Sequence, residues 1–345
     1  GGKLDAKVAG KDAGKAAEQL EEITLSPHQQ QAAARMRMDL DLPPGEALGA
    51  PSLARVTYPE WNYRKGVMLP AHCTVLPGEQ AADGELWQPD VAMQQRVRRV
   101  RRQFEALRPK RMLLRGQLDG NELDIDAVVR AQADQCASGS SSDRLYADAR
   151  TVERDLAVSI LVDVSLSTEA WVDDRRVIDL EKEALLVLGH GLQACGDQFA
   201  IHSFTSRRRD KVWLQTVKDF RETMNHSVEQ RIGALKPGHY TRMGAAIRHL
   251  TSGLAELGQR HRLLLLLTDG KPNDSDYYEG RYALDTRHAV REARRAGVRV
   301  FAVTIDRESQ GYFPRIFGRG GYSVVYRPEH LSTALPAIYR QIVAQ

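Results

Sequence analysis

The alternation of short apolar runs with segments of helical period after residue 150 constrains the fold of this chain most strongly. The apolar runs have the length of buried strands and are Leu156–Val162, Gln198–Phe204, Leu263–Leu267 and Val298–Ile305. The segments of helical period are Ile178–Leu192, Gly244–Leu257 and Thr286–Ala296. Strands that alternate with helices in this way form mostly parallel sheets with helices on both faces. We therefore predict an α/β domain over residues 150–345, with a central, mainly parallel sheet between helices.

The first 149 residues are predicted to form two smaller parts. Residues 1–50 are rich in Ala, Lys, Gln and Glu and end in the helix-breaking Pro43–Gly45, so we expect a flexible tail or linker. Residues 51–149 are predicted to be a small accessory region that contains a helix from Pro89 to Leu107. The Asp119-Gly120 pair in this region predicts a tight turn and, around it, a β-hairpin.

Composition narrows the class of protein. Lys and Arg total 49 against 45 acidic residues, a balance that gives no global signal for nucleic-acid binding. No apolar run approaches the roughly 18 residues that a membrane-spanning helix needs, and the sequence shows no basic-then-apolar segment typical of a secretory signal. Cys73, Cys136 and Cys195 have neither metal-ligand nor redox-motif spacing, so a reduced, cytoplasmic compartment is expected. Because the chain begins with Gly-Gly-Lys, we expect residue 1 to be a fragment boundary.

Polar side chains follow two of the predicted strands and open one predicted helix. Asp163, Ser165 and Ser167 follow the first strand, and alternation along an extended chain places them on one side. Asp269 follows Leu263–Leu267, and Thr241 lies in a glycine-flanked loop. Carboxylate and hydroxyl oxygens are the ligands that Mg²⁺ and Mn²⁺ prefer. These five residues therefore predict a Mg²⁺ or Mn²⁺ site, and the alternative is that the serines cap a helix while the aspartate opens a turn.

The order and spacing of these motifs resemble the metal-ion-dependent adhesion site (MIDAS) of von Willebrand factor A domains. The motifs are Asp-x-Ser-x-Ser at 163–167, the isolated Thr241 and Thr-Asp-Gly at 268–270. The resemblance implies that Asp163, Ser165, Ser167, Thr241 and Asp269 hold the ion, some directly and some through water.

Further motifs are similar to the NorD/CbbO family in particular. They are Leu267–Asp274, Phe317–Tyr322 and, upstream, Glu60–Arg64, in which Asn62 stands where an acid is expected. Members of this family are adaptors of hexameric MoxR-type AAA+ ATPases. The resemblance therefore implies such an ATPase as one partner and Rubisco or nitric-oxide reductase as the client, with Rubisco slightly favoured. Because Arg242 stands next to Thr241, we expect it either to donate a charge-assisted hydrogen bond to the client carboxylate or to lie on the surface.

Catalytic motifs are missing from the sequence. The P-loop-like spacing of Gly233 and Gly238 is followed by His239-Tyr240 instead of Lys-Ser/Thr, and neither a Gly-x-Ser-x-Gly elbow nor a His-Glu-x-x-His helix occurs. We predict that this chain is not an enzyme and binds no specific nucleic acid. Two alternatives stay open: a metal-dependent hydrolase that uses the same site, and a nucleic-acid-associated protein that uses the basic run 96–111. That run is predicted foremost as a solvated helix face or a contact with an acidic partner surface.

Overall fold

The computed structural model describes residues 54–82, 89–106, 111–151, 155–172, 175–269, 282–305, 311–327 and 330–343. The chain divides into two compact units, Gly1–Ala47 and Leu48–Gln345, and all described residues lie in the second. The predicted tail and the Lys271–Asp274 part of the family motif lie outside the described residues.

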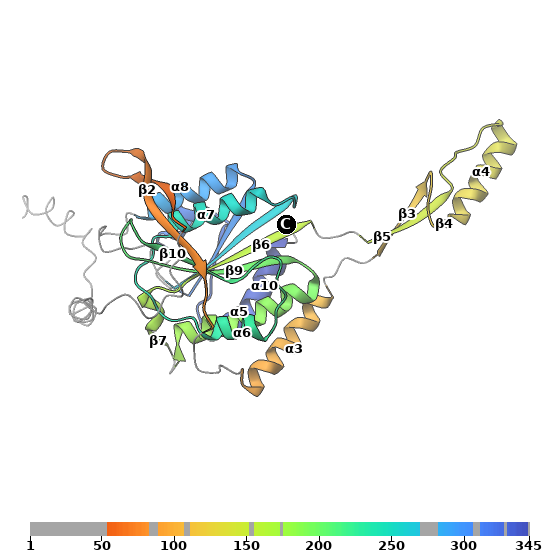
Figure 1. The fold of residues 1–345 in the computed structure, drawn as a ribbon. Coiled ribbons are helices and arrows are strands. Elements are labelled where there is room, and N and C mark those ends of the chain that lie inside the picture. Colours follow the sequence, from red (N-terminus) through yellow and green to blue (C-terminus); the bar gives the residue numbers. More distant parts are fainter. Residues whose placement is uncertain are drawn as a thin grey trace, which may run out of the picture. The chain divides into compact units, whose positions relative to one another are not determined.

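One eight-stranded sheet forms the centre of the second unit, in the order β1-β2-β10-β9-β6-β11-β12-β13 (Figure 1). Its strands are β1 (Val56–Asn62), β2 (Val67–Glu79), β6 (Leu156–Asp163), β9 (Gln198–Ser206), β10 (Val212–Lys218), β11 (His261–Thr268), β12 (Val298–Thr304) and β13 (Tyr322–Val324). The strands β9, β6, β11, β12 and β13 are parallel to one another. Strand β10 runs antiparallel to β9, and β1 runs antiparallel to β2. The predicted α/β fold with a mainly parallel sheet is confirmed.

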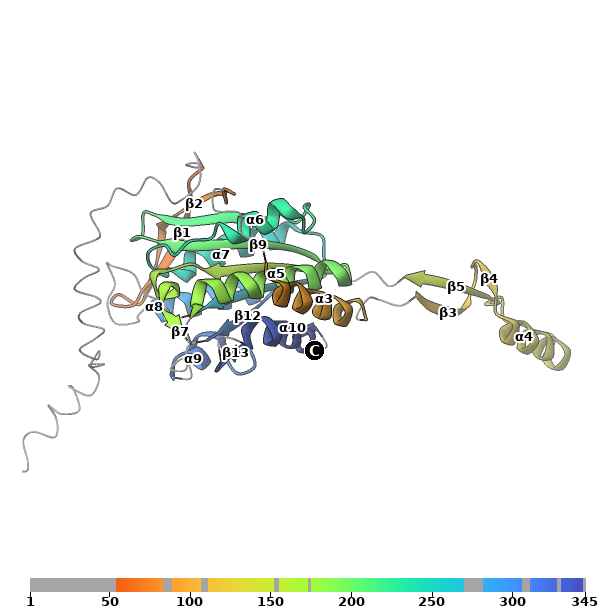
Figure 2. The ribbon, with the colours of Figure 1, turned by 90° about the horizontal axis from the view of Figure 1, so that it is seen from below.

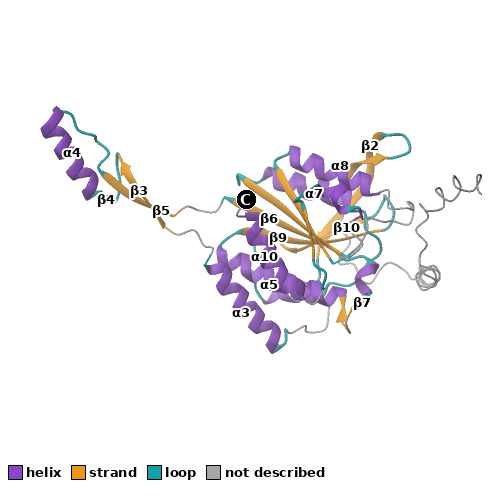
Figure 3. Ribbon diagram, turned by 180° about the vertical axis from the view of Figure 1, so that it is seen from behind, coloured by secondary structure: helices purple, strands orange, loops and turns teal. Residues whose placement is uncertain are grey.

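Helices cover both faces of this sheet (Figure 3). One face carries α3 (Val91–Glu105), α5 (Val177–Cys195), α6 (His226–Gly233) and α10 (Leu331–Val343), and Figure 2 shows α3 and α10 beside α5. The other face carries α7 (Met243–Glu256), α8 (Tyr282–Arg295) and α9 (Phe313–Phe317). Strand β6 alternates between the two apolar layers, since Ile160 joins the α5 layer and Leu161 the α7 layer. Helix α5 is buried almost all round because it lies between the sheet and helices α3, α6 and α10.

Residues before the predicted α/β domain contribute to this same core. Strand β2 pairs in parallel with β10, and β1 pairs with β2. Helix α3 confirms the predicted helix at 89–107: Asp90 caps it by accepting a hydrogen bond from the Met93 amide at 2.6 Å, and Phe104 packs against Tyr339 of α10. Residues 56–105 thus supply two strands and one helix to the sheet and layers built by residues 156–343.

A three-stranded sheet and one helix form a separate element group between α3 and β6. It comprises β3 (Arg111–Gln117), β4 (Glu122–Leu123), β5 (Tyr146–Thr151) and α4 (Ile125–Ser138). The predicted hairpin around Asp119-Gly120 is wrong, because β5 lies between β3 and β4 and pairs with both. The turn passes over β5, where a Cβ on Gly120 would lie 2.6 Å from the Ala147 carbonyl oxygen. Among the helices described, none is both long and apolar enough to cross a bilayer.

Candidate metal centre

The Asp-x-Ser-x-Ser segment leaves the end of β6 and turns. The sequence predicted an extended exit, but the chain enters a short 3₁₀ helix, η2 (Leu166–Glu169). The Ser165 amide donates to Asp163 Oδ1 at 3.1 Å, and the Ser165 and Ser167 hydroxyl oxygens lie 2.8 Å apart. Thr168 fixes the turn by donating its hydroxyl to the Ser165 carbonyl at 2.7 Å. The turn therefore brings together the three side chains that the sequence grouped by alternation.

Hydrogen bonds join the other two predicted residues to this group. The Ser167 hydroxyl donates to Asp269 Oδ1 at 2.7 Å, and the Thr241 hydroxyl donates to Asp163 Oδ1 at 3.3 Å. Because β6 and β11 are parallel, Asp163 and Asp269 meet at the same edge of the sheet. Ser165 makes no side-chain capping bond to η2, so helix capping does not account for this hydroxyl.

The loop that carries Thr241 is held by the end of β9. Thr205 accepts a hydrogen bond from the His239 amide at 2.6 Å, and Ser206 and Tyr240 exchange two backbone hydrogen bonds of 2.8 Å. A Cβ at Gly238 would lie 2.5 Å from the Thr205 hydroxyl oxygen, so only glycine allows this close approach. The backbone of β9 thus places the Thr241 hydroxyl over Asp163.

The site carries buried negative charge. Asp163 is fully buried, and this burial, together with the charge of Asp269, raises its pKa to about 8. Glu181 of α5 lies nearby: burial and then the charges of Asp269 and Asp163 raise its pKa well above the usual range. Its Oε2 atom is buried without a hydrogen-bond partner. A cation at the cluster would offset the repulsion among these carboxylates.

The donor set fits a hard divalent cation. It consists of three hydroxyls and two carboxylates, and it opens to solvent at Ser167, which is exposed, and Asp269, which is partly so. Mg²⁺ and Mn²⁺ prefer oxygen ligands of this kind and keep water in the remaining positions. Within the described ranges, no group of three or more His, Cys, Asp or Glu side chains is placed to hold a metal ion.

Two residues at the site were missed by sequence analysis. Thr268 donates its hydroxyl to Asp163 Oδ2 at 2.8 Å. Its position at the end of an apolar strand, directly before Asp269, is the sequence pattern that could have identified it. Glu181 begins a run of three charged residues, Glu181–Glu183, which has the local pattern of a solvated helical turn. All three are buried in the structure.

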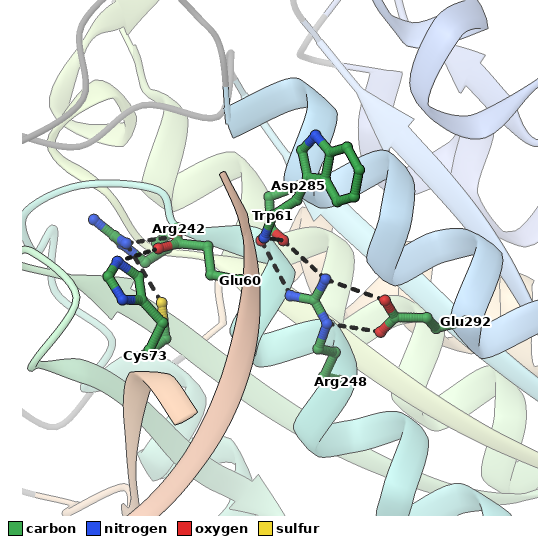
Figure 4. Close-up of polar contacts among 8 residues, drawn as sticks. Glu60, Trp61, Cys73, Arg242, Arg248, Asp285 and Glu292 are labelled. Carbon is green, nitrogen blue, oxygen red and sulfur yellow. Dashed lines mark hydrogen bonds and ion pairs between the residues drawn. The ribbon is translucent and has the colours of Figure 1, made fainter. Parts of the chain in front are cut away.

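Arg242 lies neither on the surface nor at the open side of the cluster, so both expectations for it are wrong. Its side chain is 1% exposed, and Nη1 lies 2.5 Å from Glu60 Oε1 of β1 (Figure 4). A guanidinium group so deeply buried is retained because a carboxylate is paired with it.

The basic run forms the outer face of α3. Arg96 makes an ion pair of 2.8 Å with the buried Glu183, and Arg101 pairs with Glu105 at 3.1 Å along the helix. Arg98, Arg99 and Arg102 are exposed. The predicted solvated helix face is therefore present over residues 96–102, and residues 107–110 lie outside the described part.

A parallel sheet covered on both faces, with Asp163, Ser165, Ser167, Thr241 and Asp269 gathered at its carboxyl edge, defines the class of this domain. The chain belongs to the von Willebrand factor type A domain family, whose model matches residues 158–341.

Within this class, the chain is similar to NorD proteins. It is 57% identical over 329 residues to protein NorD of Brucella melitensis, which covers 95% of this chain and 52% of that protein. It is 45% identical over 300 residues to protein NorD of Stutzerimonas stutzeri, covering 85% of this chain and 48% of that protein. The chain thus spans about half the length of the curated relatives it matches, and its resemblance to NorD is confirmed.

The comparison with solved structures also found a similar chain. Proximal thread matrix protein 1 from the mussel byssus, with a zinc-occupied MIDAS motif, is 16% identical, with a TM-score of 0.40 over 52% of this chain and 46% of that one.

Proposed function

We propose that this chain is a non-catalytic adaptor that binds an acidic residue of a client protein through a Mg²⁺-type ion. The ion is held by Asp163, Ser165, Ser167, Thr241 and Asp269, and other surfaces couple the client to a MoxR-type AAA+ ATPase. The observation that carries the proposal is the hydrogen-bonded cluster of hydroxyls and carboxylates at the sheet edge, open at Ser167. When bound, the ion supplies an electrophilic position that accepts a carboxylate.

The ligand chemistry supports capture of a carboxylate over hydrolysis. Only two of the five ligands are charged, so a divalent ion keeps positive charge that an incoming Asp or Glu neutralises. A hydrolase also needs a positioned general base. The candidate for such a base in the Thr241 loop is its one histidine, His239. Its ring packs against the ring of Trp213, with the centroids 5.5 Å apart.

The similarity to NorD proteins favours nitric-oxide reductase as the client. The family resemblance links NorD-like members to that enzyme and CbbO-like members to Rubisco, and the matched relatives carry the NorD name. Rubisco, which the sequence slightly favoured, becomes the comparison client.

Metal-dependent binding of the purified client tests this proposal. Immobilised chain is expected to capture purified nitric-oxide reductase in Mg²⁺ and to release it in EDTA, with Rubisco bound more weakly. The chain alone is expected to hydrolyse neither ATP nor generic phosphate esters or nucleic acid. Client binding that survives both EDTA and Asp163→Ala would show that recognition lies elsewhere, with the exposed arginines of α3 as the next surface to test.

An exposed tryptophan adjoins the metal loop and supports a docking surface there. Trp171 is 69% exposed and belongs to the short strand β7 (Trp171–Val172), which pairs with β8 (Arg175–Arg176). The Ala170 amide donates to the Ser167 carbonyl at 3.0 Å, so the strand continues directly from the metal loop. Arg175 ties the hairpin to the buried Glu183 at 2.8 Å. Exposed tryptophans on fixed backbones are frequent hot spots of protein interfaces.

Trp171→Ala is therefore expected to weaken client binding by about 2 kcal/mol while Mg²⁺ affinity stays unchanged. Surface plasmon resonance with the purified client, and calorimetry with Mg²⁺, measure the two quantities. Leu118→Ala, which truncates an apolar side chain that is 67% exposed after β3, serves as the control and should bind like wild type. Equal client affinity in the two variants would remove Trp171 from the interface.

A further inference from the structure

The β1–β2 hairpin lies outside the residues that match the family model, yet it contacts the two helices that follow the metal loops. Strand β1 packs against α7, which begins two residues after Thr241, and against α8, the next described element after Asp269. Two groups of buried polar contacts make this connection, and Figure 4 shows both.

The first group joins β1 to the residue after Thr241. Glu60 is 4% exposed, and its Oε1 lies 2.5 Å from Arg242 Nη1. Two residues of β2 complete the pocket: Cys73 Sγ accepts a hydrogen bond from the same Nη1 at 3.4 Å, and His72 Nε2 lies 3.4 Å from Glu60 Oε2. The Arg242 amide donates to Ser206 Oγ at 3.0 Å. Both ends of Arg242 are therefore fixed, and its side chain is fixed by the hairpin.

The second group joins β1 to the first turns of both helices. The Trp61 amide donates to Asp285 Oδ1 at 2.8 Å, and Asp285 binds both terminal nitrogens of Arg248 at 2.8 and 3.1 Å. Gly244 in the first turn of α7 lies against the same carboxylate, since a Cβ there would be 1.9 Å from Asp285 Oδ2. The start of α7 is thereby held between β1 and α8.

We infer that Glu60 is a positioning residue for the metal site and that ion binding at Thr241 is coupled to docking of the β1–β2 hairpin. The inference rests on the proposed metal site. The Glu60–Arg242 pair is buried, so loss of the carboxylate leaves a guanidinium group without its main countercharge beside the ligand loop. The loop must then move, and the Thr241 hydroxyl moves with it. By linkage, an ion that favours the ordered loop also favours the docked hairpin, and to the same extent.

The coupling predicts effects in both directions. Glu60→Gln is expected to weaken Mg²⁺ binding by about tenfold in calorimetry. In wild type, saturating Mg²⁺ is expected to slow hydrogen exchange of the β1 amides by about tenfold, and this slowing should vanish in Glu60→Gln. Tyr58→Phe is the matched control, because the Tyr58 hydroxyl lies 3.1 Å from His249 Nδ1 and so joins the same strand to the same helix away from Thr241. That variant should bind Mg²⁺ like wild type.

The outcomes separate this inference from the proposed function. Wild-type protein that binds no Mg²⁺ or Mn²⁺ would remove the metal site itself. A second outcome would overturn only the coupling. In it, ion binding depends on Asp163, but Glu60→Gln has wild-type ion affinity and Mg²⁺ leaves the hydrogen exchange of the β1 amides unchanged. If Glu60→Gln fails to fold by circular dichroism, Glu60→Gln with Arg242→Gln removes the uncompensated charge. Because it still lacks the contact that fixes the residue after Thr241 to the hairpin, this double variant should also weaken Mg²⁺ binding, and wild-type affinity in it would overturn the coupling. Equal weakening by Tyr58→Phe would mean that Glu60 acts only through general stability.

Discussion

Asp163→Ala is expected to abolish binding of Mg²⁺ and Mn²⁺ while the fold persists. Asp163 is the centre of the cluster, since it accepts hydrogen bonds from Ser165, Thr241 and Thr268. Its removal deletes one of two charged ligands and also relieves its repulsion with Asp269, which helps raise its pKa to about 8. The metal-free variant should therefore keep the wild-type circular dichroism spectrum.

Calorimetry and thermal unfolding measure this effect. Wild-type protein should gain about 2.7 kcal/mol of stability at a free ion concentration one hundred times Kd, and the variant should gain none. Ser159→Ala is the control: Ser159 lies on the same strand, is buried, and has a hydroxyl without a hydrogen-bond partner. It should keep wild-type ion affinity. Unchanged affinity in Asp163→Ala would refute the site.

Asp285→Ala is expected to lower the free energy of unfolding by about 3–5 kcal/mol. Asp285 is 2% exposed and pairs with Arg248, which is 5% exposed. Without Asp285, the buried charge of Arg248 would keep only the partly exposed Glu292 as its partner. The substitution also removes the acceptor of the Trp61 amide. Urea unfolding monitored by circular dichroism gives the value through linear extrapolation.

The control for this prediction uses the other partner of the same arginine. Glu292 binds Arg248 Nε at 2.7 Å, but its side chain is 37% exposed. Glu292→Gln should therefore cost at most about 1 kcal/mol. A loss of similar size in both variants would mean that burial does not distinguish the two ion pairs.

Local patterns predicted most of the α/β domain and the five-residue cluster. Strands β6 and β11 are nearly continuous apolar runs, and each is followed directly by polar residues, so the strands and the cluster residues at their ends could be predicted together. The turn at η2 differed from the predicted extended exit, yet the Ser165 and Ser167 hydroxyl oxygens still lie 2.8 Å apart.

Long-range polar contacts could not be predicted. Glu60 and Arg242 are 182 positions apart, and each lies in a segment whose local pattern equally fits a surface residue. The same holds for Glu181, which joins the site only because α5 is covered on all sides. The β3–β4 turn was predicted as a hairpin because the strand that separates the two, β5, comes later in the chain.

The place of β1 and β2 beside β10 also determines when the sheet can be completed during synthesis. The hairpin leaves the ribosome long before β10, the strand with which β2 pairs. It also precedes Arg242, which neutralises its buried Glu60, and Arg248, which neutralises its acceptor Asp285 on α8. The edge of β2 that pairs with β10 has no partner strand in that interval, and pairings so distant in sequence form slowly. The nascent chain therefore carries an unprotected β-edge, which is a site for mispairing with other chains. The sheet can therefore be completed only after β10 has been synthesised, and the buried ion pairs beside it only after α8.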